Sequence, residues 1–253
     1  MDVAERTIIV TGGSSGIGRS IAITLADHDA AVVIADKERE PRGDDNPTDI
    51  VIQENGGEAR FIQIDVTDED SVQHMVYTAA KTYEGVSGLV NNAGVHHSST
   101  IHEEDSDAWQ RLFAVNVDGY YLCMKYVLDH FVREDVAGDI VNIGSIAGLV
   151  GFGESAAYCA SKGAVVELTR EAAVDYGSDG INVNAVDPGV IKTEMTAAMR
   201  DDEEQRRFLA NNTVAPRLGE PDDVADAALF LLSSRSDFVM GENLVVDGGW
   251  TAR

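Results

Sequence analysis

Residues 6–37 read RTIIVTGGSSGIGRSIAITLADHDAAVVIADK, and this stretch decides the fold. Residues 7–10 are rich in β-branched side chains, and residues 31–35 form a continuous apolar run, which is typical of a parallel strand covered on both faces. Between them, residues 16–27 carry apolar side chains at helical spacing after a glycine-rich turn. The order strand, glycine turn, helix and strand predicts a βαβ unit.

The rest of the 253-residue chain repeats this alternation. Further strands are expected within residues 59–65, 88–94, 139–145, 181–189 and 243–249, and helices within residues 48–55, 71–83, 105–133, 157–177, 194–212 and 222–233. Seven strands with crossover helices and no internal repeat predict the α/β class, as a single-domain Rossmann fold over residues 1–253 with a doubly wound, seven-stranded parallel sheet and helices on both faces. Residues 37–49 are polar with two prolines, which predicts an exposed loop whose role stays open.

The charge of the chain is strongly negative. Asp and Glu total 44 against 19 Lys and Arg, giving a formal net charge of −25, and only five of the basic residues are lysines. Such a surface excludes nucleic acid and anionic membranes as partners. Self-repulsion fades when salt shortens the screening length, so we expect a halophilic protein of a very salty cytoplasm. The alternative is a merely acidic mesophilic protein.

Three further observations bear on the compartment. No apolar run reaches the length of a membrane-spanning helix. The start of the chain, MDVAERTIIVTGG, contains acidic residues and too short an apolar run for a signal peptide. Two cysteines, Cys123 and Cys159, do not make a disulfide framework, which fits a reduced cytoplasmic protein.

The turn TGGSSGIG, residues 11–18, is the first candidate binding site. Glycines after a first strand let a phosphate-bearing ligand approach the backbone, and the N-terminus of the following helix attracts its negative charge. The spacing of Gly12, Gly16 and Gly18 is followed by no lysine of the P-loop kind, which disfavours a nucleotide triphosphatase. A purely structural tight turn is the alternative.

Asp36 ends the second expected strand, eighteen residues after Gly18. A carboxylate at this place can bond the ribose hydroxyls of NAD and would repel the 2′-phosphate of NADP. Lys37 follows directly and could moderate that discrimination. The sequence therefore favours NAD, with a loop charge or helix cap as the alternative reading of Asp36.

The segment SAAYCASKGAVVELTR, residues 155–170, contains the second candidate site. Tyr158 and Lys162 stand four positions apart in a helix-prone run, so they are neighbours on one helix face. Burying such a pair is costly unless it serves a purpose. A structural alternative has the tyrosine packing and the lysine extending outward, and Cys159, pointing elsewhere, is interpreted as packing.

Read together, these motifs resemble those of the short-chain dehydrogenase/reductase family, over nearly the whole chain. Eight marks appear in the family's order, with Ser145 and Tyr158 thirteen residues apart as its pattern requires. They are TGGSSGIG, Asp36, Asp65-Val66, NNAG at residues 91–94, Asn116, Ser145, YCASK at residues 158–162 and DPGVIKT at residues 187–193.

The resemblance implies a catalytic set of Asn116, Ser145, Tyr158 and Lys162. Tyr158 would be the general acid/base. Because a free phenol has a pKa of about 10, nearby positive charge would be needed to favour the phenolate, from the Lys162 ammonium one turn away and from oxidised nicotinamide. Lys162 would also bond the nicotinamide ribose, Ser145 would orient the substrate oxygen, and Asn116 would hold a water that leads protons to solvent. A helix cap is the alternative for Ser145, and a satisfied core residue is that for Asn116.

The same resemblance implies the residues that hold the dinucleotide. Asp65 and Val66 would lie at the adenine, Asn91 to Gly94 at the adenosine ribose and central crevice, and residues 188–193 at the carboxamide. The full expected set is Gly12, Ser14, Ser15, Gly16, Ile17, Gly18, Asp36, Asp65, Val66, Asn92, Ala93, Gly94, Tyr158, Lys162, Pro188, Gly189, Ile191 and Thr193. No metal is expected, since His96, His97 and His102 are interpreted as solvated polar residues.

The implied activity is NAD-dependent hydride transfer between nicotinamide and a secondary alcohol or ketone. The substrate pocket is expected between residues 94–100, residues 146–155 and a mobile segment at residues 194–212, with Leu149, Val150, Phe152 and Glu154 as lining candidates and Met195 and Met199 in the lid. Because Glu154 and His97 could bond sugar hydroxyls, a sugar or polyol, as in a glucose 1-dehydrogenase, is the first substrate hypothesis. The alternatives are a 3-oxoacyl-thioester reductase and a non-catalytic NAD-binding sensor. Relatives usually form homotetramers through their long helices and C-terminal strands, and the apolar faces of residues 112–128 and 164–173 fit such burial.

Overall fold

The computed structural model describes residues 2–43 and 45–252. In this part of the chain the strands form one seven-stranded parallel sheet, as predicted, and their order is β3-β2-β1-β4-β5-β6-β7. The strands are β1 (Thr7–Thr11), β2 (Ala31–Asp36), β3 (Glu58–Gln63), β4 (Gly88–Asn91), β5 (Gly138–Ile143), β6 (Ile181–Pro188) and β7 (Asn243–Val246). The order reverses between β1 and β4, and ligands of doubly wound sheets bind at this switch point.

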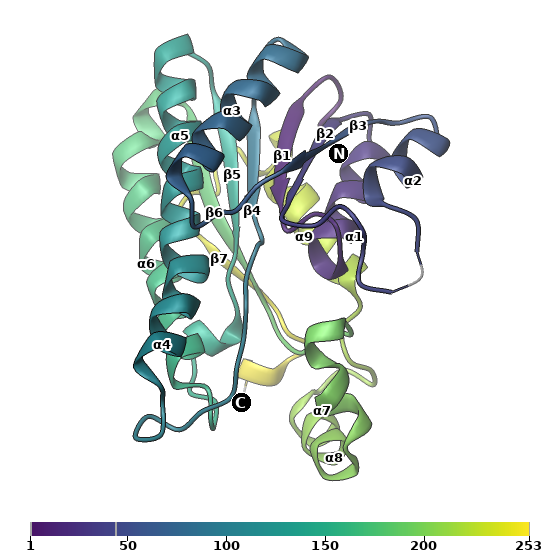
Figure 1. Cartoon of the computed structure of the whole chain (residues 1–253), viewed down its shortest axis with the longest axis vertical. Helices are drawn as coiled ribbons and strands as arrows, with labels where there is room; N and C mark the ends of the chain where they lie inside the picture. The colour runs from purple at the N-terminus through teal and green to yellow at the C-terminus, as the bar shows by residue number, and fades with distance from the viewer. Residues whose placement is uncertain (1, 44, 253) are drawn as a thin grey trace.

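Helices cover both faces of the sheet (Figure 1). One core cluster contains residues of α1 (Gly16–Ala26), α2 (Thr48–Glu54) and α9 (Pro221–Leu231). The other contains residues of α3 (Glu69–Tyr83), α5 (Gly119–Glu134) and α6 (Ala156–Tyr176).

The strands divide their side chains between these two clusters because successive residues of a strand point to opposite faces. In β1, Ile8 and Val10 belong to the first cluster and Ile9 to the second. In β2, Ile34 belongs to the first and Val33 to the second. The continuous apolar runs of the sequence are therefore explained by burial on both faces.

The helix expected over residues 105–133 differs from the prediction. The structure has α4 (Ser106–Phe113), a π-helical turn (Ala114–Asp118) and then α5, so the wider turn interrupts the α-helical register in the middle. π-Helical turns are rare and often occur at functional sites. This one contains Asn116, a member of the expected catalytic set.

Residues 194–212 form two short helices rather than one. These are α7 (Ala197–Asp201) and α8 (Glu203–Asn212), which project together from the end of the molecule (Figure 1). The break falls at Asp202, whose carboxylate accepts a hydrogen bond of 2.8 Å from the Gln205 amide and so caps α8. In the described part of the chain, every helix is too short or too polar to pass through a bilayer.

Candidate active site

The expected site residues meet where the parallel strands end. At the switch point, Asn92 directly follows β4. Its side-chain amide nitrogen donates to the carbonyls of Thr11 and Gly12, at the end of β1, at 3.0 and 3.1 Å. The Thr11 hydroxyl accepts from the amides of Asn92 and Ala93, at 2.9 and 3.2 Å. These bonds join the glycine turn to the NNAG motif across the crevice.

The glycine turn leaves no room for side chains. Gly12 has a left-handed φ of +64°, and a Cβ there would lie 2.8 Å from the Asn92 amide nitrogen. A Cβ on Gly18 would lie 2.2 Å from the Gly12 carbonyl oxygen, because α1 begins directly against the turn. The Ser14 hydroxyl is buried with no protein partner. This cradle of bare backbone at a helix N-terminus fits the phosphates of a dinucleotide.

Asp36 ends β2 beside this cradle. Its Oδ2 accepts from the Ser14 amide at 3.1 Å, and its Oδ1 accepts from the Lys37 amide at 2.7 Å. The Lys37 ammonium is turned to Asp65, which it contacts at 2.7 Å. The bond from Lys37 holds the pKa of the Asp65 carboxyl at about 2, so Lys37 is engaged by a carboxylate that is ionised near neutrality.

The loop at residues 37–49 is attached to the same turn. The Arg42 amide donates to the Ser15 hydroxyl at 2.8 Å, and the Thr48 hydroxyl donates to the Gly13 carbonyl at 2.9 Å. Arg39 pairs with Asp49 at 2.7 Å. The described part of this loop therefore borders the expected binding site of the cofactor's ribose and phosphates.

The segment after β6 reaches the turn from the other side. A Cβ on Gly16 would lie 3.5 Å from the Thr193 methyl group, while Ile191 is buried. Gly189 packs against Asp247, and a Cβ at position 189 would lie only 2.8 Å from the Asp247 Cα. Of the remaining expected residues, Ile17 packs on the first core cluster, Val66 lies against Gly119, Gly94 faces Asn116 and Pro188 ends β6.

Ser145 and Tyr158 lie together, as their spacing predicts. Ser145 follows β5 and begins a 3₁₀ turn, where its hydroxyl accepts from the Ala147 amide at 3.1 Å. Tyr158 stands in the first turn of α6, where burial raises the pKa of its phenol and a hydrogen bond with the Ser145 side chain partly offsets that rise. Ser145 therefore caps the 3₁₀ turn, as in the alternative interpretation, and also pairs with Tyr158.

Lys162 is buried one turn further along α6. Its ammonium donates to the Ile143 carbonyl at 2.7 Å and to the Tyr120 hydroxyl at 3.3 Å, and it lies 5.9 Å from the centre of the Tyr158 ring. The structural alternative, in which this lysine extends outward, is wrong, since the residue is only 3% exposed.

The electrostatics of the pair differ from the expectation. Burial raises the pKa of the Tyr158 phenol despite the bond to Ser145. Burial also lowers the pKa of Lys162 to about 8. Burial thus disfavours the charged form of both groups, the Tyr158 phenolate and the Lys162 ammonium.

Asn116 is held by three hydrogen bonds. Its side-chain nitrogen donates to the Val95 carbonyl at 2.9 Å and to the Ser161 hydroxyl at 3.2 Å, and its oxygen accepts from the Val95 amide at 2.9 Å. The side chain thus ties the loop after NNAG to α6. It is the satisfied core residue of the alternative reading, placed beside Lys162.

The segments expected to form the pocket are brought together. Ser99 bridges to Ser155, and its amide donates to the Glu154 carbonyl at 2.9 Å. The rings of His96 and Tyr158 meet edge to face at 5.0 Å. His97, however, bonds Glu104 at 2.6 Å, so it is already engaged and does not point freely to a sugar hydroxyl.

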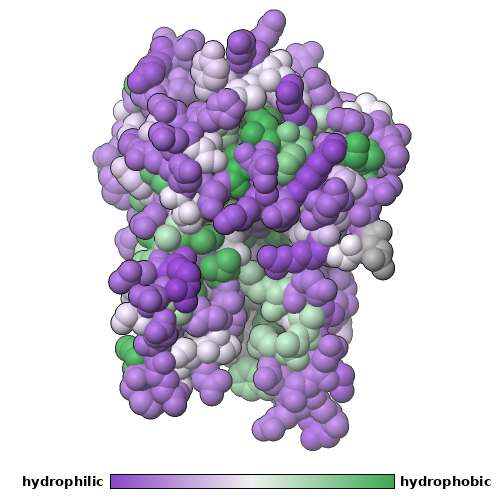
Figure 2. All heavy atoms as spheres, viewed as in Figure 1, coloured by the Kyte–Doolittle hydropathy of each residue, from purple (hydrophilic) through white to green (hydrophobic). Residues whose placement is uncertain are grey.

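An aromatic cluster of Phe152, Phe208 and Trp250 links the segment at residues 194–212 to this site. Trp250 stacks on Phe152 at 5.5 Å and meets Phe208 of α8 edge to face at 5.6 Å. Asp247 rigidifies the C-terminal turn by accepting from the Gly249 and Thr251 amides, each at 2.7 Å. Figure 2 shows the corresponding hollow beside the α7–α8 projection, with hydrophobic residues inside a hydrophilic surface.

Three contributors were not identified from the sequence. Tyr120 stands four residues after Asn116, on the same helix face, and that spacing could have indicated its contact with Lys162. Asp187 belongs to the DPG motif, but only the fold shows that it contacts the Ser145 amide, at 3.0 Å. Trp250 is too far along the chain for any spacing rule to connect it with Phe152.

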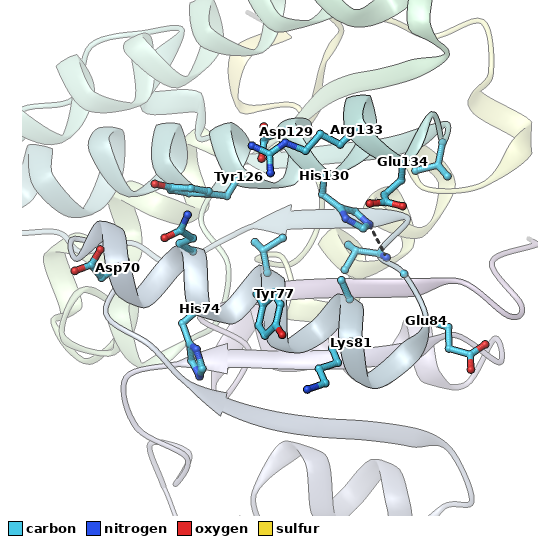
Figure 3. A pocket seen from close by; sticks show the side chains of 16 residues that line it. Asp70, His74, Tyr77, Lys81, Glu84, Tyr126, Asp129, His130, Arg133 and Glu134 are labelled. Atoms are coloured by element: carbon cyan, nitrogen blue, oxygen red, sulfur yellow. Dashed lines mark hydrogen bonds and ion pairs between the residues drawn. The ribbon is translucent and has the colours of Figure 1, made fainter.

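A large groove elsewhere contains none of the expected residues. It lies between α3 and α5 and is lined by His74, Tyr77 and Lys81 from one helix and His130 and Arg133 from the other (Figure 3). The His130 ring bonds the Val86 amide at 3.2 Å. Over residues 2–43 and 45–252, no three potential metal-binding side chains gather here or anywhere else.

Comparison with known proteins gives the class. A family model described as enoyl-(acyl carrier protein) reductase matches residues 12–251. The chain is 41% identical to cis-4-hydroxycyclohexanecarboxylate dehydrogenase from Sinomonas cyclohexanicum, over 98% of each chain. A short-chain type dehydrogenase/reductase from Mycobacterium ulcerans is 34% identical with a TM-score of 0.93, covering 100% of this chain and 92% of that one. The solved structure of a protein from Agrobacterium tumefaciens, with bound NADP, is 33% identical to this chain and has a TM-score of 0.92. The match covers 100% of this chain and 98% of that one.

The chain belongs to the short-chain dehydrogenase/reductase family, as its motifs predict. It is an oxidoreductase with the fold that binds a nicotinamide cofactor.

Proposed function

We propose that this protein catalyses the NAD-dependent interconversion of a secondary alcohol and its ketone. The observation that carries the proposal is the convergence of Ser145, Tyr158 and Lys162 at the carboxyl end of β5, next to the glycine cradle at the switch point. The 41% identical relative, a dehydrogenase named for a hydroxycyclohexane, supports a CH–OH donor.

In the oxidation direction, the bound nicotinamide supplies the acceptor for the hydride that leaves the carbinol carbon. The Ser145 hydroxyl orients the substrate oxygen by a hydrogen bond. The Tyr158 phenolate takes the hydroxyl proton as the ketone forms, and in reduction the phenol returns it. Ser145 supports this exchange because its hydrogen bond lowers the pKa of the phenol.

Lys162 is the residue that would hold the cofactor's ribose. Among the described residues its ammonium bonds the Ile143 carbonyl and the Tyr120 hydroxyl, so a third N–H can donate a hydrogen bond to a ribose hydroxyl. Because burial raises the pKa of Tyr158 in the protein alone, the positive charge of oxidised nicotinamide would be required to make the phenol acidic. Asn116 contributes by fixing Val95 and Ser161, and its side-chain oxygen, which accepts one hydrogen bond there, keeps a second acceptor position for a proton-conducting water.

NAD is the proposed cofactor rather than NADP. Asp36 places a carboxylate at the end of β2, and Lys37 is paired with Asp65 instead of being free to neutralise a 2′-phosphate. We expect kcat/KM to favour NAD by at least tenfold. Replacement of Asp36 by Ala should remove most of that preference, whereas Lys37→Ala should leave it intact; a preference that disappears only with Lys37→Ala would contradict this assignment.

The proposed substrate is a compact cyclic or polyhydroxylated secondary alcohol. The stacked Phe152 and Trp250 rings offer an apolar surface to one face of a ring. Glu154, exposed in the same segment, can accept from a further hydroxyl. A sugar remains within this class, although His97 is engaged by Glu104.

An acyl thioester on an acidic carrier is the less favoured substrate. Docking such a carrier needs a basic patch, for which Arg206, Arg207 and Arg217 are the candidates. Arg207 pairs with Glu203 and Arg217 with Asp223, while Arg206 donates to the Arg200 carbonyl at 3.3 Å. The non-catalytic sensor is disfavoured by the intact site and would bind NAD without any turnover.

We further propose a halophilic, cytoplasmic homotetramer. Exposed apolar side chains lie on two separate regions, which supports two interfaces: Tyr121, Val132 and Val174 on α5 and α6, and Phe238, Met240 and Val245 at the edge formed by β7. Two interface types closing symmetrically give a tetramer. Light scattering in molar KCl would test this, and a monomer would contradict it.

The direct test of the activity is Tyr158→Phe. General acid–base groups contribute roughly 10²–10⁴-fold to rate, so we expect kcat to fall by at least 10²-fold while NADH binding, followed by its fluorescence, is retained. Turnover close to that of the wild-type protein would show that Tyr158 is not the acid/base.

A further inference from the structure

Asp187 is a buried carboxylate without an assigned task. It lies near the end of β6 and is 0% exposed. Its Oδ1 accepts from the Ser145 amide at 3.0 Å, while its Oδ2 is buried and has no hydrogen-bond partner among the described residues. A half-satisfied buried carboxylate is costly to keep, so a benefit elsewhere is to be expected.

Its position points to that benefit. Lys162 bonds the Ile143 carbonyl from one side, and Asp187 bonds the Ser145 amide from the other. Gly144 lies between them with no space for a side chain, because a Cβ would sit 1.8 Å from the Asp187 Oδ1. At the end of β5, Ile143 is thus bonded by a cationic side chain and Ser145, two residues further on, by an anionic one.

We propose that Asp187 is a positioning residue that fixes Ser145 against Tyr158 and provides the buried counter-charge for the Lys162 ammonium. The inference rests on the proposed function only for its kinetic consequence. Asp187→Asn keeps an acceptor for the Ser145 amide and removes the charge, and Asp187→Ala removes both, so the two variants separate position from charge.

The surroundings of Asp187 carry charges from several elements. Lys162 and Arg170 on α6 favour its ionised form, and Glu242, just before β7, opposes it. Burial raises the pKa of the carboxyl to about 6, within the range of activity assays. The carboxylate in turn favours the charged Lys162 ammonium, which opposes the lowering of its pKa by burial, and disfavours the Tyr158 phenolate.

The deciding test reads the Lys162 ammonium itself. With only five lysines, the ¹⁵N resonance of its Nζ can be followed in labelled protein through a pH titration. We expect the midpoint to fall by at least half a pH unit in Asp187→Asn. The matched control is Asp139→Asn, which alters another buried carboxyl of raised pKa that pairs with Arg6 at 2.6 Å and lies at the start of β5. It should leave the midpoint unchanged, and an equal midpoint in Asp187→Asn and wild-type protein would overturn the counter-charge role, whether or not any alcohol is turned over.

The kinetic test reads the position of Ser145. We expect Asp187→Ala to lower kcat/KM at least tenfold at pH 8, with the NADH Kd changed less than threefold, and Asp187→Asn to recover at least half of the loss on a logarithmic scale. The acid limb near pH 6 should be present in wild-type protein and Asp139→Asn and absent from Asp187→Asn. Activity of Asp187→Ala within twofold of wild type would overturn the positioning role, and an unchanged acid limb in Asp187→Asn would overturn the role of the Asp187 charge.

Discussion

At the scale of single residues, burial governs the site more than pairing does. Tyr158, Lys162 and Asp187 each have a pKa shifted against the charged form, and burial is the largest cause each time. Such shifts often mark functional sites. Here they mean that the protein alone holds its acid/base group protonated, and that a bound positive charge is needed to release the proton.

The raised pKa of Asp187 predicts a pH-dependent stability. The unfolded chain ionises this carboxyl near its ordinary 3.8, and the folded chain ionises it at about 6. The cost of the buried charge is absent below pH 3.8 and fully present above pH 6. Asp187→Asn should therefore be more stable than wild type at pH 8, by up to about 3 kcal/mol, with the difference shrinking as the pH falls to 4. Thermal melts of both proteins at the two pH values check this, and a difference independent of pH would contradict it.

At the scale of elements, two helical glycines differ in why glycine matters: one is required by close packing, and the other only lowers the helix propensity. Both Gly18 in α1 and Gly163 in α6 are helical. A Cβ on Gly18 would meet the Gly12 carbonyl at 2.2 Å, whereas one on Gly163 would meet nothing closer than 3.8 Å. Gly18→Ala should abolish NADH binding, while Gly163→Ala should stabilise the fold by about 0.5–1 kcal/mol. Dinucleotide titration and denaturant unfolding measure these effects, and normal NADH affinity in Gly18→Ala would contradict the close packing at the turn.

The aromatic cluster of Phe152, Phe208 and Trp250 predicts how α8 takes part in substrate binding. Each aromatic contact contributes about 0.5–1.5 kcal/mol beyond its area, so Trp250→Ala should raise the substrate KM by roughly tenfold without weakening NADH binding. The control is Trp109→Ala, which removes a tryptophan that stacks on Phe113 within α4 at 4.7 Å. If both variants raise KM equally, the cluster has no special role in the pocket.

Local periodicity carried most of the fold prediction but not the site's irregularities. The two-face burial of β1 and β2 is written in their apolar runs, so the sheet could be predicted. The π-helical turn could not, because the partners of its Asn116, Val95 and Ser161, are distant in sequence and no local pattern indicates them. For the same reason the DPG motif indicated the right region, while the contact of Asp187 with Ser145 needed the packed structure.

At the scale of the whole molecule, charge is the dominant feature. A net charge of −25 produces repulsion over the surface that salt screens within a few ångströms at molar concentration. We expect the melting temperature to rise steadily from 0.1 to 2 M KCl. A melting temperature that is highest at low salt would contradict the halophilic assignment, and the same series in a non-ionic osmolyte controls for preferential exclusion.

In the proposed reaction, a phenol beside a bound nicotinamide exchanges a proton with a secondary alcohol. Its most direct measurement is NADH formation at 340 nm in molar KCl, with cyclic and polyhydroxylated secondary alcohols, for wild-type protein and Tyr158→Phe. We predict turnover with NAD for the wild-type protein and at least a 10²-fold loss in the variant, with NADH binding preserved in both. Folded wild-type protein that binds NADH but oxidises no alcohol and reduces no corresponding ketone would contradict the account.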